Sequence, residues 1–172
     1  FVRDAAAVQA QLSAPNMQAE GGGDEPESLL DALYKVASME EAGLQDGEDP
    51  GKWRAQGTCA RAVIFFTDAT FKPAMSLPEA AGGAVGDVIN KVTSAKIILC
   101  GFHPEWSGYE ELGSLDKSQL KAVVTASASP ALAGLGKDGP EGRAAQKAAV
   151  DGLRDFANSP DAFVKIMEQL GK

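Results

Sequence analysis

The stretch "ARAVIFFTDATFKP", residues 60–73, decides the fold. Its first half is a short apolar run without polar alternation, which is typical of a strand buried on both faces of a parallel sheet. A similar run, "AKIILCGF" at residues 95–102, follows a segment, residues 84–95, whose apolar side chains fall at helical spacing. Residues 120–127, "LKAVVTAS", form a third candidate strand. Strands that alternate with helices predict a doubly wound α/β domain, with a mostly parallel sheet and helices on both faces.

The rest of the chain is expected to add helices to this sheet. Apolar residues at helical spacing predict further helices over residues 2–12, 24–37, 105–115, 142–157 and 159–172. Residues 40–58 are acidic and contain glycine, so we expect an exposed loop there. We find no internal repeat and predict that residues 1–172 form a single α/β domain.

Composition argues against several classes of partner. The 172 residues carry a formal net charge of −8 with 44% hydrophobic side chains. Such a chain lacks the clustered lysine and arginine that nucleic acids and anionic membrane surfaces require. Its apolar runs are far too short to insert into a bilayer. The charge is compatible with cations or basic partners, although acidic solubility is the commoner reason for it.

The two cysteines are expected to be free thiols. Cys59 and Cys100 fall at opposite ends of the two predicted strands. A disulfide needs Cα atoms within about 7 Å of each other, which this placement does not allow. Free thiols mildly favour a reducing compartment.

An acidic cluster precedes the second predicted helix, in "EGGGDEPESLLDALYKV", residues 20–36. Asp24 and Glu27 belong to this cluster, and Asp68 leaves the carboxyl end of the first strand, where ligands bind in sheets of this kind. Carboxylate oxygens are hard ligands that suit magnesium, manganese or calcium. We therefore expect the glycine loop and Asp68 to share one rim of the sheet and to face a cation.

The same cluster has a simpler interpretation. Acidic residues in a first helical turn offset the helix dipole, and Asp24 suits a capping position with Pro26 in the first turn. On spacing alone this capping interpretation is favoured over a metal site, and "TDA" after a strand is often only a polar turn.

The ordered combination of "GGGDEPESLLDALYKV", "ARAVIFFTDATFKP" and "AKIILCGF" resembles a von Willebrand factor type A domain. The resemblance covers roughly residues 1–125 and the last helix. Domains of this family carry a metal-ion-dependent adhesion site. By resemblance, Asp68 matches the family's third metal motif, and "DEPE" is similar to the integrin β-subunit variant "DSPE", whose closing glutamate faces the metal. Glu27 would then face the main ion, while Asp24 and Pro26 would serve a second one.

The resemblance implies a binding module without enzymatic activity that acts in protein–protein interaction, as in cell adhesion. Mg²⁺ or Mn²⁺ would occupy the main site and Ca²⁺ a neighbouring one. The ion would hold an acidic residue of a protein ligand. The loops "TDATFK" and "GFHPEW" would form the rim around it, with Thr70, Phe71, Lys72 and His103 as candidate contacts.

One family motif is missing. The first metal motif, Asp-x-Ser-x-Ser at the end of the first strand, is not found; residues 123–129 have the serine spacing, but Thr125 stands where the aspartate should be. Because the chain also starts at Phe1, we expect it to be the C-terminal portion of such a domain. A second chain, or a segment outside this sequence, would then complete the sheet beside residues 62–67. The rival hypothesis is a structural or assembly domain with the same fold and a degenerate metal site.

Catalysis is the least favoured hypothesis. His103 is the only histidine, and we expect it to be a loop residue hydrogen-bonded to its surroundings. There is no Gly-x-Ser-x-Gly elbow, and neither cysteine has a recognisable histidine partner. The glycines of "GLGKDGPEG", residues 134–142, lack the order of a phosphate loop. A metal-dependent hydrolase is therefore held as improbable.

Overall fold

A computed structural model describes residues 26–44, 49 and 51–159. Their contacts divide into two compact units, one containing the described residues of 39–60 and the other those of 25–38 and 61–159. The helices expected over residues 2–12 and 160–172 lie outside the described residues.

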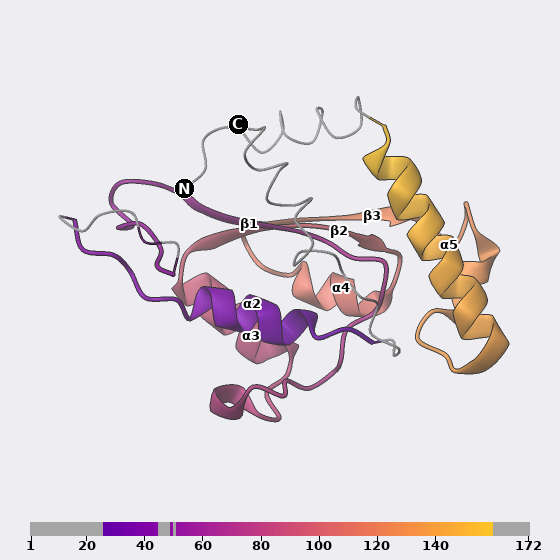
Figure 1. Ribbon diagram of the computed structural model, residues 1–172, viewed down its shortest axis with the longest axis horizontal. Helices are drawn as coiled ribbons and strands as arrows, with labels where there is room; N and C mark the ends of the chain where they lie inside the picture. Colours follow the sequence, from indigo (N-terminus) through magenta and orange to yellow (C-terminus); the bar gives the residue numbers. More distant parts are fainter. Residues whose placement is uncertain (1–25, 45–48, 50, 160–172) are drawn as a thin grey trace. The chain divides into compact units, whose positions relative to one another are not determined.

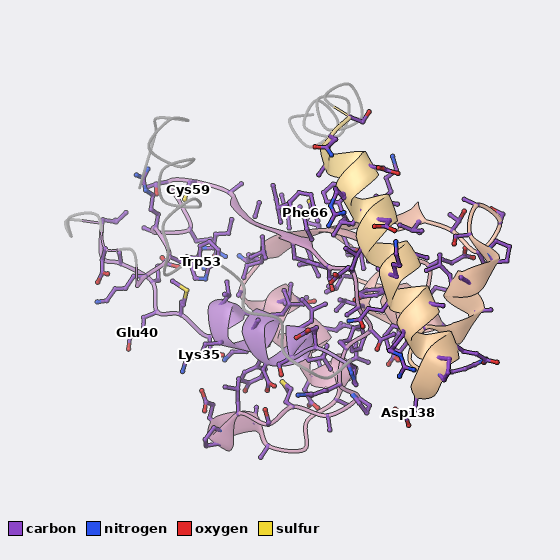
Figure 2. The ribbon with its side chains drawn as sticks, turned by 45° about the vertical axis from the view of Figure 1, so that its right-hand side comes forward. Lys35, Glu40, Trp53, Cys59, Phe66 and Asp138 are labelled. Atoms are coloured by element: carbon purple, nitrogen blue, oxygen red, sulfur yellow. The ribbon has the colours of Figure 1, made fainter. Side chains whose placement is uncertain are left out.

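The smaller unit has one short backbone pairing. Trp53 N donates to Glu40 O at 2.8 Å, and Ala42 N donates to Trp53 O at 2.7 Å. The Glu41 carboxylate accepts a hydrogen bond from Gln56 N at 3.1 Å, and Figure 2 labels Glu40 and Trp53 of this unit. The segment expected as an exposed loop therefore has no described helix, yet its ends are held together.

The larger unit contains a three-stranded parallel sheet of order β1-β2-β3. The strands are β1 (Arg61–Phe66), β2 (Ile97–Pro104) and β3 (Ser118–Val124). This confirms the predicted α/β class and the parallel pairing. Strand β3 starts and ends earlier than predicted, because the chain turns at Thr125, whose carbonyl accepts hydrogen bonds from Ala128 N and Ser129 N.

Within the described residues, four α-helices accompany the sheet (Figure 1): α2 (Leu29–Ala37), α3 (Val85–Ser94), α4 (Ser107–Leu112) and α5 (Gly139–Ala157). Two short 3-10 turns span Pro78–Ala80 and Pro130–Gly134. Helix α3 contacts α2, α4 and β2, and α5 contacts β3 and β2. Figure 1 shows α2, α3 and α4 together on one side of the sheet and α5 next to β3.

The apolar spacing in the sequence explains the helix packing. Leu30, Leu33 and Ala37 of α2 are buried, and so are Val88 and Val92 of α3. These residues recur every three or four positions, so each helix places one stripe against the core.

The sheet has one well-covered face and one partly open face at β1. On the covered face, Phe65 stacks on Tyr109 of α4. On the other, Phe66 stacks on Phe102 and Phe102 stacks on Phe156 of α5, with ring centroids 4.9 and 5.2 Å apart. Ile64 and Phe66 nevertheless remain 40% and 47% exposed, and Figure 2 shows Phe66 on the side of β1 away from α2. The prediction that this strand is buried on both faces is therefore wrong; of the three described strands, β2 alone is buried along its length.

The two cysteines are free, as predicted. Cys100 is buried within β2, and desolvation raises the pKa of its thiol. Among the described residues, no helix has the length and apolar character needed to cross a membrane.

Candidate metal centre

The carboxyl end of β1 runs into a turn that is tied to the segment before α2. Glu27 N donates to Thr70 O at 3.0 Å, and Lys72 N donates to Glu27 O at 2.9 Å. These two bonds form an isolated parallel bridge between Glu27 and Phe71. The structure thus joins the two segments that carry Glu27 and Asp68, although they are about forty residues apart in sequence. We call this junction, residues 27 and 68–72, the Glu27–Asp68 corner.

Glu27 lies outside helix α2. The helix was expected from residue 24, but it begins at Leu29 with Ser28 at the N-cap position. Pro26 and Glu27 therefore precede the helix, and the prediction that they belong to its first turn is wrong. Capping of that turn does not account for the exposed Glu27 side chain. Asp24 lies outside the described residues.

Asp68 lies in a turn that is held by hydrogen bonds to the backbone of the next residue, Ala69. Thr67 Oγ1 accepts a hydrogen bond from Ala69 N at 3.3 Å. The Tyr109 hydroxyl donates to Ala69 O at 2.6 Å. Asp68 itself is half-buried. Neither its carboxylate nor that of Glu27 forms a hydrogen bond or ion pair with the described residues, so both keep their oxygens available for another ligand.

Two of the residues expected on a ligand-binding rim support the corner from within. Thr70 and Phe71 are only 2% and 5% exposed. Phe71 packs edge-on against Trp106 and Tyr109, with ring centroids 4.8 and 5.3 Å apart. Lys72 is half-buried. The contribution of Thr70 and Phe71 is therefore to hold the backbone of the corner in place.

His103 belongs to strand β2, so the prediction of a loop position is wrong. The ring is buried, stacks on Tyr109 with centroids 4.1 Å apart, and has Nδ1 2.8 Å from Pro104 O. Desolvation lowers the pKa of His103, and the hydrogen bond to Pro104 opposes this only in part. The expectation that it is hydrogen-bonded to its surroundings is met by the Pro104 carbonyl.

Sequence reasoning missed two residues that organise the corner. Tyr109 anchors the Asp68 turn through its hydroxyl and lies under Phe71 and His103. Asp31 binds the backbone of residues 76–77, which follow the corner. Tyr109 lies three residues before Leu112 on a short helix, and this spacing indicates burial. The sequence does not indicate the hydrogen-bond partner of the Tyr109 hydroxyl or of the Asp31 carboxylate.

The donor set of the corner fits a hard divalent cation. Mg²⁺ keeps several of its waters and needs only one or two protein carboxylates; Glu27 and Asp68 are the residues of the corner that could provide them. No group of three or more histidine, cysteine, aspartate or glutamate side chains in metal-binding proximity occurs within residues 26–44, 49 and 51–159.

Comparisons with protein-family models, with curated proteins and with solved structures find no match. The resemblance to von Willebrand A domains thus stays a hypothesis carried by the motifs. What this chain does is inferred from its own residues.

Proposed function

We propose that this chain is a non-enzymatic binding module whose interaction with a protein ligand depends on a divalent cation. Its fold would be a portion of a doubly wound, von Willebrand A-like domain. The parallel sheet, with α2, α3 and α4 on one side and α5 contacting β2 and β3, supports this proposal. In such sheets ligands bind beyond the carboxyl ends of the strands, where the Glu27–Asp68 corner lies.

One observation carries the proposal: the pairing of Glu27 with residues 70–72 brings its segment beside Asp68. Neither the Glu27 nor the Asp68 carboxylate has a hydrogen bond or ion pair with the described residues, and carboxylates on neighbouring segments repel each other unless a cation lies near them. Mg²⁺ or Mn²⁺ would be held by Glu27 and Asp68, with water on its remaining positions. Ca²⁺ at a neighbouring site would involve Asp24, outside the described residues.

The charge of the chain explains why a metal is needed for the proposed ligand. A net charge of −8 repels an acidic partner over the whole surface. A bound divalent ion is the largest local charge at its site and reverses the sign of the field there. An acidic side chain of a partner protein would then complete the coordination of the ion.

Magnesium should stabilise the folded chain through the corner. At ten times its dissociation constant, Mg²⁺ is expected to add about 1.4 kcal/mol, because it binds the folded state alone. For a chain of this size the midpoint of thermal unfolding should rise by about 3–5 °C. Glu27→Gln and Asp68→Asn should each abolish most of this rise, since an amide oxygen is a weaker ligand than a carboxylate. Differential scanning calorimetry measures the shift.

Glu111→Gln and Asp116→Asn are the matched controls, because both side chains are exposed and neither residue belongs to the corner. They should keep the full response to Mg²⁺. An equal rise in all five proteins would mean that the ion acts through general charge screening and would contradict the proposal.

A structural or assembly domain with the same fold is the second candidate. The observation that favours it is the open face of β1, where Ile64 and Phe66 are exposed, together with the position of β1 at the edge of the described sheet. Such an edge invites a further strand from another segment or chain. This function predicts no thermal response to Mg²⁺ in the wild-type chain.

A further inference from the structure

A groove of about 410 Å³ lies between helix α4 and strand β3. Tyr109 and Glu110 line it from α4, Gln119 and Leu120 from β3, and His103 from β2. Strand β3 is the last in the order of the described sheet, so no described strand closes the groove on that side. A volume of this size suits a small ligand or a single long side chain.

The buried histidine presents an unused acceptor to this groove. His103 is only 6% exposed, yet it lines the groove. Its Nδ1 must carry the proton that it shares with Pro104 O, because a carbonyl oxygen only accepts. In the neutral ring, Nε2 then holds a lone pair. The stacking on Tyr109, whose hydroxyl is bonded to Ala69 O, fixes the ring in this orientation.

No hydrogen bond from the described residues reaches His103 Nε2. Nε2 is also not one of the fully buried polar atoms that lack a partner in this part of the chain. It therefore meets open space, and the groove provides that space. Solvent reaches Nε2 there, so a ligand N–H that enters the groove can replace the water at this acceptor.

The charges around the groove select the type of ligand. Glu110 contributes a carboxylate, and no lysine or arginine is among the lining residues. The phenol of Tyr109 already donates to Ala69 O. The groove thus offers the acceptor His103 Nε2, the carboxylate of Glu110 and the apolar side chain of Leu120. The negative charge of Glu110 disfavours anions.

We propose that this groove binds an organic cation that donates hydrogen bonds, an alkylammonium or alkylguanidinium group. One N–H of the cation donates to His103 Nε2, Glu110 pairs with its charge, and its alkyl part lies against Leu120 and the Tyr109 ring. The site needs no metal ion. It can therefore be tested in the metal-free chain, whether or not the Glu27–Asp68 corner binds a cation.

The single histidine makes the test site-specific, because a nitrogen-detected NMR spectrum of the chain contains one imidazole Nδ1 signal and one imidazole Nε2 signal. The metal-free chain is titrated at pH 7.5 with n-butylguanidinium and, separately, with the uncharged n-butylurea. We expect n-butylguanidinium to shift the Nε2 signal in a saturable way, with a dissociation constant of about 1 mM. The urea should bind at least about fivefold more weakly because it lacks the charge.

Glu110→Gln and its neighbour Glu111→Gln provide the matched pair, since both side chains are exposed and only Glu110 lines the groove. Glu110→Gln should weaken the binding of n-butylguanidinium about fivefold, and Glu111→Gln should leave it unchanged. A peptide, acetyl-Gly-Arg-Gly-amide, separates the two sources of the cation. Tighter binding of the peptide indicates an arginine side chain, and equal binding indicates a small molecule; both support the site.

Three results would overturn the proposal. The first is an imidazole signal that does not respond to n-butylguanidinium. The second is equal binding of n-butylurea, which would remove the role of charge. The third is an affinity that Glu110→Gln leaves unchanged.

Discussion

Replacing Asp31 by alanine should lower the free energy of unfolding by about 3 kcal/mol. The Asp31 carboxylate is buried on α2 and accepts three hydrogen bonds, from Ser76 N at 2.8 Å, Ser76 Oγ at 2.9 Å and Leu77 N at 3.1 Å. Removing it leaves two backbone N–H groups of a partly buried loop without acceptors. Urea unfolding followed by circular dichroism measures the loss.

Asp116→Ala is the control, because Asp116 is exposed and lies outside this network. It should change stability by less than about 0.5 kcal/mol. If Asp31→Ala cost no more than Asp116→Ala, the hydrogen bonds to the 76–77 backbone would not hold α2 against that loop.

The same carboxylate predicts a dependence on pH. Desolvation raises the pKa of Asp31, but the hydrogen bonds from Ser76 and Leu77 outweigh it, so the pKa lies below its ordinary value of 3.8. A lowered pKa in the folded state means that the stabilisation is present above the unfolded pKa and is lost as the pH falls through the folded one. The difference between the wild-type chain and Asp31→Ala should therefore be constant near neutral pH and shrink below about pH 3.8.

Replacing Gly101 by valine should cost about 3 kcal/mol. Gly101 lies in the central strand β2, opposite Phe65 on β1 and Leu120 on β3. A Cβ atom at this position would lie 2.2 Å from Phe65 Cζ and 2.8 Å from Leu120 Cδ2. Both side chains would have to move away from the layer that also contains Tyr109. The midpoint of urea unfolding reports the loss.

Gly86→Ala is the matched control, and it should change the stability in the opposite direction. Nothing lies within 4 Å of a Cβ built on Gly86, which is a residue of helix α3. Alanine there should stabilise the chain by about 0.5–1 kcal/mol, because it reduces the freedom of the unfolded chain and favours the helix. If Gly101→Val were as well tolerated as Gly86→Ala, this would contradict the close packing of Phe65 and Leu120 against Gly101.

The elements were predictable where one local pattern decided them. The apolar runs before Asp68 and His103 are strands β1 and β2, because short runs rich in β-branched and aromatic residues favour strands. Strand β3 was misplaced, since "VVTAS" continues the apolar run while the backbone turns at Thr125. The exposed face of β1 was not predictable, because the sequence of a strand does not record which neighbour covers it.

The candidate site was predictable only in part. The sequence placed Glu27 and Asp68 at the carboxyl end of the sheet, and the structure joins their segments through the bridge between Glu27 and Phe71. The predicted start of α2 was too early, because proline and acidic residues are typical of the first turn of a helix, and Pro26 and the acidic cluster precede the actual start at Leu29. The burial of Thr70 and Phe71, and the hydroxyl of Tyr109 on Ala69 O, depend on long-range packing that spacing does not encode.

The central claim is that Glu27 and Asp68 together hold a divalent cation. Paramagnetic broadening by Mn²⁺ tests it most directly, because the ion broadens the NMR signals of nuclei close to it. With substoichiometric Mn²⁺, the amide signals of Glu27 and of residues 68–72 should disappear first, and excess Mg²⁺ should restore them. Signals near Asp151 and Asp155, exposed or half-buried carboxylates on α5, should persist. Uniform loss of signals at every acidic side chain, or loss that remains unchanged in Glu27→Gln and Asp68→Asn, would contradict the claim.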